Sequence, residues 1–323
     1  MTSLNKTNSA AVAAAKRIAG KVQYTELRYS EYFSQELSAR VFFKLENLQT
    51  TGSFKLRGAT NKLMMLSDAE RAKGCVAASS GNHGAAVACA MHALNTRGIV
   101  FVPEQTSDAK VKKIRSYGGE IRYFGTDGLD TEEHAREYAR KEGMIYLSPY
   151  NDEDVVAGQG TCGVEILQQL PDVDTAFIAV GGGGLVGGVG SVLKANNPEI
   201  QVYGCQPKAS AVMARSVEAG KLLQLPSEKT ISDGTAGGIE AGAITFGLNQ
   251  AVVDEFVVVD EEQIAAAMRL YMNAEGHIIE GAAGVAVAAM LARREHIVGK
   301  NVVTIVCGGN ISHEALASVR DGT

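Results

Sequence analysis

Short apolar runs alternate with longer amphipathic stretches along most of this 323-residue chain. The runs are rich in Val, Ile, Phe and Tyr, which favour strands, and the stretches repeat apolar residues at helical spacing. Alternation of this kind predicts right-handed βαβ crossovers and parallel sheets, and runs that are apolar throughout predict helices on both faces. We therefore expect an α/β protein with strands at 41–46, 75–79, 98–103, 120–125, 144–148, 175–181, 201–206, 255–260 and 301–309, and with helices that include 82–94, 131–142, 158–170, 261–275 and 282–298.

The length of the chain favours two lobes over a single core. A composition of 46% hydrophobic and 21% charged residues is ordinary for a globular protein and leaves this expectation unchanged. The sequence "LSPYND" (147–152) places a proline and polar turn residues at the end of an expected strand. We place one boundary between the lobes there, near residues 145–150.

The charge and the cysteines argue against several classes of protein. A net charge of −5 speaks against a nucleic-acid partner, because proteins that bind a phosphate backbone usually carry a basic face. The basic stretch 110–122 is closely followed by acidic residues, which favours a solvated helix. Five widely spaced cysteines without a CxxC pair indicate neither a disulfide framework nor a zinc site, and no apolar run has the length of a membrane span. Because the N-terminus also lacks the pattern of a signal peptide, we expect a cytoplasmic protein with no membrane partner.

The sequence "GGGGLVGG" (181–188) follows the expected strand at 175–181 and opens a helix. Glycines let the backbone approach a ligand closely, and the free N–H groups at the start of a helix favour an anion. We predict a phosphate site here, with a tight turn that binds nothing as the alternative. Three of the glycines also match the GxGxxG pattern of dinucleotide sites, but the next strand ends at Gln206, without the carboxylate that such a site needs.

The sequence "SSGNHG" (79–84) follows another expected strand and also opens a helix. Free N–H groups at this position can bind a carboxylate, and the side chain of Asn82 can donate a hydrogen bond to a phenolate-like oxygen. Helix capping alone is the alternative for Ser79, Ser80 and Asn82. For His83, the alternative is simple packing against the turn.

Two further residues, a lysine and a cysteine, are candidates for the same site. Lys55 lies between Phe54 and Leu56 in "TTGSFKLRGAT" (50–60), at the expected start of a helix and in an unusually apolar setting for a lysine. Cys307 ends the last expected strand, where its thiol is either an inert core group or a weak donor to a ring nitrogen. A phosphate nest, a carboxylate-binding turn, a partner for a ring nitrogen and an isolated lysine together suit pyridoxal phosphate, which forms a Schiff base with a lysine amine.

The chain also resembles a known family. The motifs "TGSFKLRGA", "SSGNHG", "AGQGT" (157–161), "GGGGLVGG" and "CGGN" occur in the order and approximate spacing of the pyridoxal-phosphate serine/threonine dehydratases and serine racemases, which are fold type II (tryptophan synthase β-like) enzymes. The match runs from about residue 10 to 315, and five motifs in order are highly specific. The resemblance implies two open, parallel-rich sheets flanked by helices. It further implies a large cofactor-binding domain of residues 1–50 and 148–323 and a small domain of residues 51–147, with the first boundary between 50 and 75.

The resemblance implies a role for each residue of these motifs. Lys55 becomes the Schiff-base lysine, and Ser80 becomes a second catalytic acid/base on the opposite face of the cofactor. Cys307 takes the position that faces the ring nitrogen. The remaining cofactor-binding residues are Phe54 against the ring, Asn82 at the 3′-oxygen, and Gly181, Gly182, Gly183, Gly184 and Leu185 at the phosphate, while Ser79, Ser80, Gly81, Asn82 and His83 surround the substrate carboxylate.

The implied activity is β-elimination from a 3-hydroxy amino acid such as L-threonine or L-serine, which yields a 2-keto acid and ammonia. A neutral thiol at Cys307 leaves the ring nitrogen unprotonated, which favours elimination over transamination. Serine racemase, 3-hydroxyaspartate dehydratase and β-replacement activities on the same scaffold stay open, as does an amino-acid sensor without chemistry. A nicotinamide-dependent oxidoreductase, suggested by the GxGxxG match, is the alternative of another class.

The chain departs from the family pattern in two places. Where racemases and several dehydratases carry the carboxylates of a divalent-cation site, this chain has Gln206, Ser210 and Val212, so we expect no metal there. The substrate-side loop "DGTAGGIEAGAITF" (233–246) is glycine-rich and acidic where many threonine dehydratases are more basic, which leaves the substrate side chain open. The family norm predicts a homodimer, and the expected partner is a small amino-acid substrate.

Overall fold

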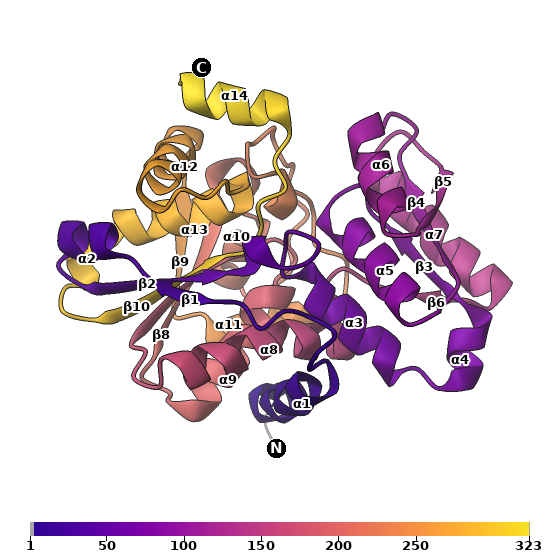
Figure 1. The fold of residues 1–323 in the computed structure, drawn as a ribbon, viewed down its shortest axis with the longest axis horizontal. Coiled ribbons are helices and arrows are strands. Elements are labelled where there is room, and N and C mark those ends of the chain that lie inside the picture. Colours follow the sequence, from indigo (N-terminus) through magenta and orange to yellow (C-terminus); the bar gives the residue numbers. More distant parts are fainter. Residues whose placement is uncertain (1–2, 323) are drawn as a thin grey trace.

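The computed structural model describes residues 3–322, which form two separate β-sheets. Figure 1 shows a six-stranded sheet with its helices on one side of the view and a four-stranded sheet with its helices on the other. We call these the large-sheet part and the small-sheet part. Within residues 3–322, no helix combines the length and the apolar character needed to cross a membrane.

The large sheet has the strand order β1-β2-β10-β7-β8-β9. Neighbouring strands are parallel except for β1 and β2, where Leu27 lies opposite Lys44 and Tyr29 opposite Phe42. The central strands are buried along almost their whole length, so both faces of the sheet require cover. In sheet order the strands span Leu27–Tyr29 (β1), Arg40–Leu45 (β2), Asn301–Val306 (β10), Thr175–Ala179 (β7), Gln201–Pro207 (β8) and Glu255–Val259 (β9).

Helices cover the two faces of the large sheet (Figure 1). On one face lie α12 (Glu261–Glu275) and α13 (Gly281–Ala292), and α13 is buried along most of its Gly-, Ala- and Val-rich length. On the other face, α8 (Glu153–Gln169) and α9 (Gly184–Asn196) pack against each other, and α1 (Ser3–Arg17) packs against both. One apolar cluster joins these strands and helices into the main core.

The small sheet has the order β5-β4-β3-β6, and all its neighbouring strands are parallel. An apolar cluster that includes α5 (Asn82–Ala93) and α6 (Asp108–Ser116) covers one face, and α7 (Gly128–Glu142) packs on the other through Ala135 and Ala139. Both faces are therefore covered here too. The strands span Glu120–Tyr123 (β5), Gly98–Val102 (β4), Cys75–Ala78 (β3) and Ile145–Tyr146 (β6).

Helix α3 (Lys55–Met65) connects the two parts, because it packs against both α8 and α5. Its Gly58 approaches α8 so closely that a Cβ added to Gly158 would lie 2.6 Å from the Gly58 Cα. The Oε1 of Gln159 accepts a hydrogen bond of 3.1 Å from the Gly58 N–H. The motif "AGQGT" thus serves to seat α8 against the helix that begins at Lys55.

The α/β class and all nine expected strands are confirmed, with strand ends within three residues of those expected. The helix expected at 282–298 ends earlier, at Ala292, and a 3-10 turn follows it. Strand β1 was not expected, because it has three residues and pairs only with β2. The division into two domains stays a prediction. The remaining elements are α2 (Glu31–Leu37), α4 (Asp68–Lys73), α10 (Val212–Glu218), α11 (Ile244–Val252), α14 (His313–Asp321) and 3-10 turns at Glu46–Leu48, Lys208–Ser210, Asp233–Thr235 and Arg294–His296.

Candidate active site

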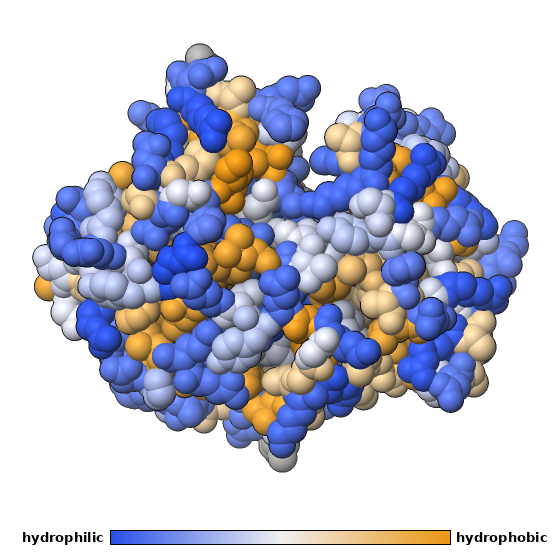
Figure 2. All heavy atoms as spheres, in the orientation of Figure 1, coloured by the Kyte–Doolittle hydropathy of each residue, from blue (hydrophilic) through white to orange (hydrophobic). Residues whose placement is uncertain are grey.

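Three loops of the large sheet meet at one edge. Strands β2, β10 and β7 are adjacent and parallel, so their carboxyl ends lie side by side, where open α/β sheets bind ligands. The chain leaves β2 toward Lys55, β10 toward Cys307 and β7 toward Gly181. Figure 2 shows that the surface is hollowed into a notch between the two parts of the molecule, where α14 and α6 face each other.

The loop before Lys55 is tied directly to the loop that follows β10. Ser53 and Gly308 form an isolated antiparallel bridge. The Phe54 N–H donates to the Cys307 carbonyl at 3.1 Å, and the Gly309 N–H donates to the Gly52 carbonyl at 3.0 Å. Two motifs from opposite ends of the sequence therefore form one continuous piece of backbone structure.

Lys55 is the first residue of α3 and is half-buried. Its Nζ donates a hydrogen bond of 2.9 Å to the Pro149 carbonyl and lies 5.2 Å from the centre of the Phe54 ring. Burial lowers the pKa of Lys55 to about 8, and the nearby Cys307 and Glu280 offset part of that effect. The amine is therefore partly neutral near physiological pH, as a nucleophile or base requires.

The glycine loop forms a cradle of backbone N–H groups at the start of α9. Gly183 has φ +81°, a left-handed conformation that favours glycine, and its carbonyl accepts a hydrogen bond of 3.0 Å from Asn249 Nδ2. The N–H groups of Gly184 and Leu185 belong to the first turn of α9, where the helix itself offers them no acceptor. This arrangement suits an anion such as a phosphate.

Tyr150 lies against this cradle. A Cβ added to Gly182 would come within 2.3 Å of the Tyr150 ring, so a larger residue could not replace this glycine without moving the ring. The next residue back, Pro149, holds Lys55 through its carbonyl. The sequence predicts only a boundary between lobes at "LSPYND", and the structure shows that this segment also borders the lysine and the glycine cradle.

The turn at the start of α5 keeps several N–H groups free. Gly81 precedes the helix, and its N–H donates to Ser79 Oγ at 3.1 Å; Ser80 is half-buried beside it. His83 is buried, and its Nε2 lies 2.9 Å from the Leu147 carbonyl. Burial and the nearby charge of Lys55 lower the pKa of His83 to about 3, so the ring stays neutral and packs against the segment before Pro149.

A buried glutamate that we did not expect connects α5 to the loop after β10. Asn82 Nδ2 donates to both carboxylate oxygens of Glu280, at 2.9 and 3.0 Å, and the Asn310 N–H donates to Oε2 at 3.0 Å. Asn310 Nδ2 also donates to Asn82 Oδ1 at 2.6 Å, so the orientation of the Asn82 amide is fixed from both sides. Burial raises the pKa of Glu280 to about 7, although these hydrogen bonds oppose the shift.

No sequence pattern marked Glu280 as a site residue. It directly precedes the Gly- and Ala-rich α13, where an acidic residue suggests no more than a favourable charge at a helix start. Its partner Asn82 lies 198 residues earlier in the chain. The one available signal was a lone glutamate in an otherwise apolar stretch, "HIIEGAAG" (277–284).

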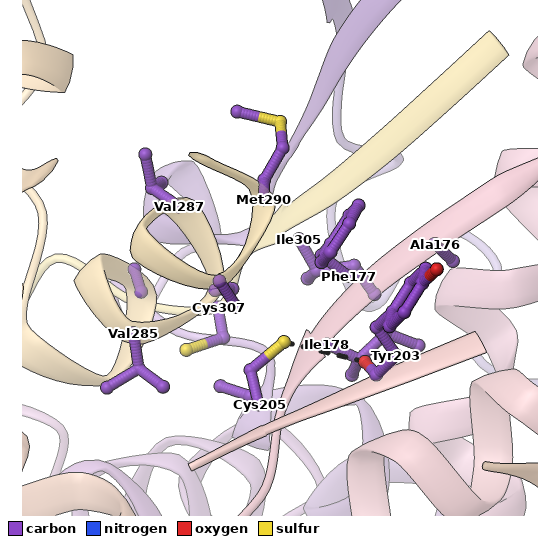
Figure 3. Close-up of a cluster of buried hydrophobic side chains, with 14 of the residues drawn as sticks. Ala176, Phe177, Ile178, Tyr203, Cys205, Val285, Val287, Met290, Ile305 and Cys307 are labelled. Atoms are coloured by element: carbon purple, nitrogen blue, oxygen red, sulfur yellow. Dashed lines mark hydrogen bonds between the residues drawn. The ribbon is translucent and has the colours of Figure 1, made fainter. Parts of the chain in front are cut away.

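Cys307 belongs to the apolar core (Figure 3). It is buried at the end of β10, and Figure 3 shows its thiol between α13 and Cys205, near Val285. Burial raises the pKa of Cys307 well above the ordinary value, so the thiol is neutral. Both expectations for this residue, a core group or a neutral partner for a ring nitrogen, are compatible with this setting.

Gln206 stands where related enzymes carry a carboxylate of a divalent-cation site, and here its side chain forms hydrogen bonds within the protein. Gln206 Nε2 donates to the Val180 carbonyl at 3.0 Å, and its Oε1 accepts from the Ala214 N–H at 2.7 Å. Among residues 3–322, no three His, Cys, Asp or Glu side chains are grouped to hold a metal ion. The absence of a metal stays a prediction.

The basic helix α6 is largely exposed, as expected, but two of its lysines make contacts with the large-sheet part. Lys113 donates to the Asn310 side chain, and Lys110 lies 3.7 Å from the Asp233 carboxylate. Two lysines of the small-sheet part thus reach loops of the large-sheet part, because α6 borders the notch.

These residues fit pyridoxal phosphate. A lysine with a lowered pKa, an N–H cradle at a helix start, a fixed asparagine amide and a neutral thiol match its aldehyde, phosphate, 3′-oxygen and ring nitrogen in chemistry.

Comparison with known proteins agrees with this fit. The family described as pyridoxal-phosphate dependent enzyme matches residues 18–308. The catabolic L-threonine dehydratase of Escherichia coli is 37% identical over 312 residues, which cover 95% of this chain and 94% of that protein. The processed form of threonine deaminase isoform 2 from Solanum lycopersicum has a TM-score of 0.93 at 33% identity over 98% of this chain and 92% of that one, and maize serine racemase has 0.90 at 31% over 98% and 97%. The chain belongs to the pyridoxal-phosphate dependent enzymes of fold type II.

Proposed function

We propose that the enzyme dehydrates and deaminates a 3-hydroxy amino acid, L-threonine or L-serine, and releases a 2-keto acid and ammonia. The observation that carries this proposal is the partly neutral Lys55 amine, held where the loops of β2, β10 and β7 meet. The relatives named threonine dehydratase and threonine deaminase support the same reaction, since they match this chain over nearly its whole length.

In this proposal, Lys55 holds the cofactor, Phe54 packs against its ring and Asn82 donates to its 3′-oxygen. The N–H groups of residues 181–185 bind its phosphate, and Cys307 faces its ring nitrogen. Pyridoxal phosphate, when bound, withdraws electrons from the α-carbon of an amino acid joined to it. The neutral Cys307 thiol supports its assignment, and Asn82 Nδ2 would give up one of its two hydrogen bonds to Glu280 in order to donate to the 3′-oxygen.

Lys55 acts as the general base. Its Nζ takes the proton from the substrate α-carbon, for which a pKa near the working pH is favourable. The N–H groups of Asn82 and His83, which lie in the first turn of α5 and have no acceptor within the helix, bind the substrate carboxylate together with the neighbouring turn from Ser79 to Gly81. In this proposal Ser80 lies on the face of the cofactor opposite to Lys55, where its hydroxyl would exchange a proton with the α-carbon of D-substrates.

The proposal is tested with Lys55→Ala. We expect the purified variant to lose both the visible absorbance band of the lysine-bound cofactor and the release of 2-keto acid and ammonia from L-threonine and L-serine. Lys73→Ala, which changes an exposed lysine on α4, is the matched control and should behave as the wild type. Full production of keto acid by Lys55→Ala would reject the assignment.

We also propose that the enzyme acts as a cytoplasmic homodimer. Five free cysteines, four of them buried, suit a reducing compartment. The exposed aromatic side chains of Tyr24, Tyr29 and Tyr32 around β1 support an interface on that side. Sedimentation equilibrium of the purified protein gives the subunit number directly.

A further inference from the structure

An ion-pair cluster spans the two parts of the molecule beside Tyr150. Arg136 of α7 lies 2.7 Å from the Glu132 carboxylate on its own helix and 2.7 Å from the carboxylate of Glu240, in the loop between α10 and α11. Its guanidinium also lies 4.3 Å from the centre of the Tyr146 ring. We call Glu132, Arg136 and Glu240 the Arg136 cluster. Its Glu240 comes from the glycine-rich, acidic loop whose role the sequence left open.

The Arg136 cluster borders the site through Tyr150. The Glu240 N–H donates a hydrogen bond of 3.0 Å to Tyr150 Oη, and the same tyrosine lies against Gly182 of the cradle. Glu132 is close enough to Lys55 for its charge to act on the pKa of that amine. The cluster therefore lies beside Tyr150 and within electrostatic reach of Lys55.

The charges of the Arg136 cluster determine which substrate side chains can bind beside it. Two carboxylates surround one guanidinium, so the net charge is negative and the single cation is already paired. Glu240 Oε1 is buried and has no hydrogen-bond partner among residues 3–322. A substrate carboxylate placed beside the cluster would be repelled by its net negative charge, whereas a methyl or hydroxyl group would meet no such repulsion.

We propose that Glu240, by pairing with Arg136, makes the enzyme select 3-hydroxy amino acids with an uncharged side chain and reject those with a side-chain carboxylate, such as 3-hydroxyaspartate. This inference rests on the proposed function and names its substrate class. Glu240 repels a side-chain carboxylate of the substrate and also occupies Arg136, the one cation of the cluster that could bind such a carboxylate. Repulsive contacts of this kind are a common way to exclude a competing substrate. Removing its charge leaves Arg136 paired with Glu132 alone, so the guanidinium can also pair with a substrate carboxylate.

The test compares kcat/KM for L-threonine with kcat/KM for L-threo-3-hydroxyaspartate at constant ionic strength. In Glu240→Gln we expect the ratio of kcat/KM for L-threonine to kcat/KM for 3-hydroxyaspartate to fall by about tenfold or more, mainly through a lower KM for 3-hydroxyaspartate. In the double variant Glu240→Gln/Arg136→Met, this gain should disappear, because no guanidinium is left to bind the carboxylate. The matched control is Glu137→Gln, which removes a carboxylate from the same helix that pairs with the exposed Arg140 at 2.6 Å; it should leave the ratio unchanged.

Two outcomes would overturn the inference. One is an unchanged ratio in Glu240→Gln, and the other is an equal fall in kcat/KM for both substrates, which would make the pair a structural contact only. If the wild-type enzyme releases keto acid from neither L-threonine nor L-serine, the proposed function fails and takes the inference with it. Turnover of L-threonine with an unchanged ratio rejects the inference alone.

Discussion

The amine of Lys55 gives up its proton more readily than an ordinary lysine, because burial disfavours the ammonium form. With a pKa of about 8, roughly one amine in ten is neutral at pH 7 and roughly nine in ten at pH 9. Only the neutral amine attacks the aldehyde of the cofactor. We expect the initial rate at which cofactor-free protein binds pyridoxal phosphate to rise about tenfold between pH 7 and 9 and to level off above about pH 9. The growth of the visible absorbance band measures this rate, and a flat profile would contradict the shifted pKa.

Gly183 is the residue of the cradle whose left-handed backbone conformation disfavours any side chain. At φ +81°, an alanine is strained by about 1–2 kcal/mol, and its Cβ would lie 2.5 Å from Asn249 Nδ2. We expect Gly183→Ala to raise the dissociation constant for pyridoxal phosphate at least about tenfold, by titration of the cofactor absorbance. Gly247→Ala, on the exposed side of α11 with no atom within 4 Å of the added Cβ, is the control and should bind as the wild type. Equal affinities in the two variants would show that the turn does not need its left-handed residue.

At the scale of an element, α3 is anchored by a group of buried charges just after Lys55. Arg57 pairs with Glu46 at 2.7 Å and with Glu165 at 2.6 Å, and Lys44 pairs with Glu165 at 2.6 Å. Although burial raises the pKa of Glu46, the Arg57 guanidinium holds it below its ordinary value, so the carboxylate is charged. Two cations and two carboxylates thus neutralise each other at the point where α3, α8 and β2 meet.

We expect Arg57→Met to lower the free energy of unfolding by about 3–5 kcal/mol, because it leaves two buried carboxylates with one cation between them. Denaturant unfolding measures the change. Arg71→Met is the control, because Arg71 on α4 pairs with the exposed Asp68 and should contribute about 0–1 kcal/mol. If the two variants were equally stable, the buried group would not anchor the helix.

Elements differ in how well the sequence predicts them. The nine expected strands are apolar runs rich in strand-forming residues, and each is found. The partners of Arg57 were not predictable, because Glu46 and Glu165 lie 11 and 108 residues away and carry no pattern of their own. Glu280 and Tyr150 were not predicted as site residues for the same reason, since each acts through contacts that only the tertiary fold creates.

At the scale of the whole molecule, the sequence identified the loops that carry chemistry but not why they meet. That depends on the strand order, in which Arg40 of β2 lies opposite Asn301 of β10 and Thr175 of β7 lies opposite Val302. Such pairings join residues far apart in the chain and follow from no local periodicity. The cofactor could therefore be predicted from motifs, whereas the Arg136 cluster required the two parts to be placed against each other.

The bridge between Ser53 and Gly308 makes a single frame of the backbone on either side of the site, with Lys55 at one end and Cys307 at the other. Backbone hydrogen bonds set the spacing of these two residues before any ligand arrives. A ring that contacts both would lose its own freedom of motion on binding, but it would not also have to order two independent loops. Much of the conformational entropy needed to order this site is therefore lost during folding and not on binding. The affinity for the cofactor then depends mainly on the contacts between the cofactor and the site.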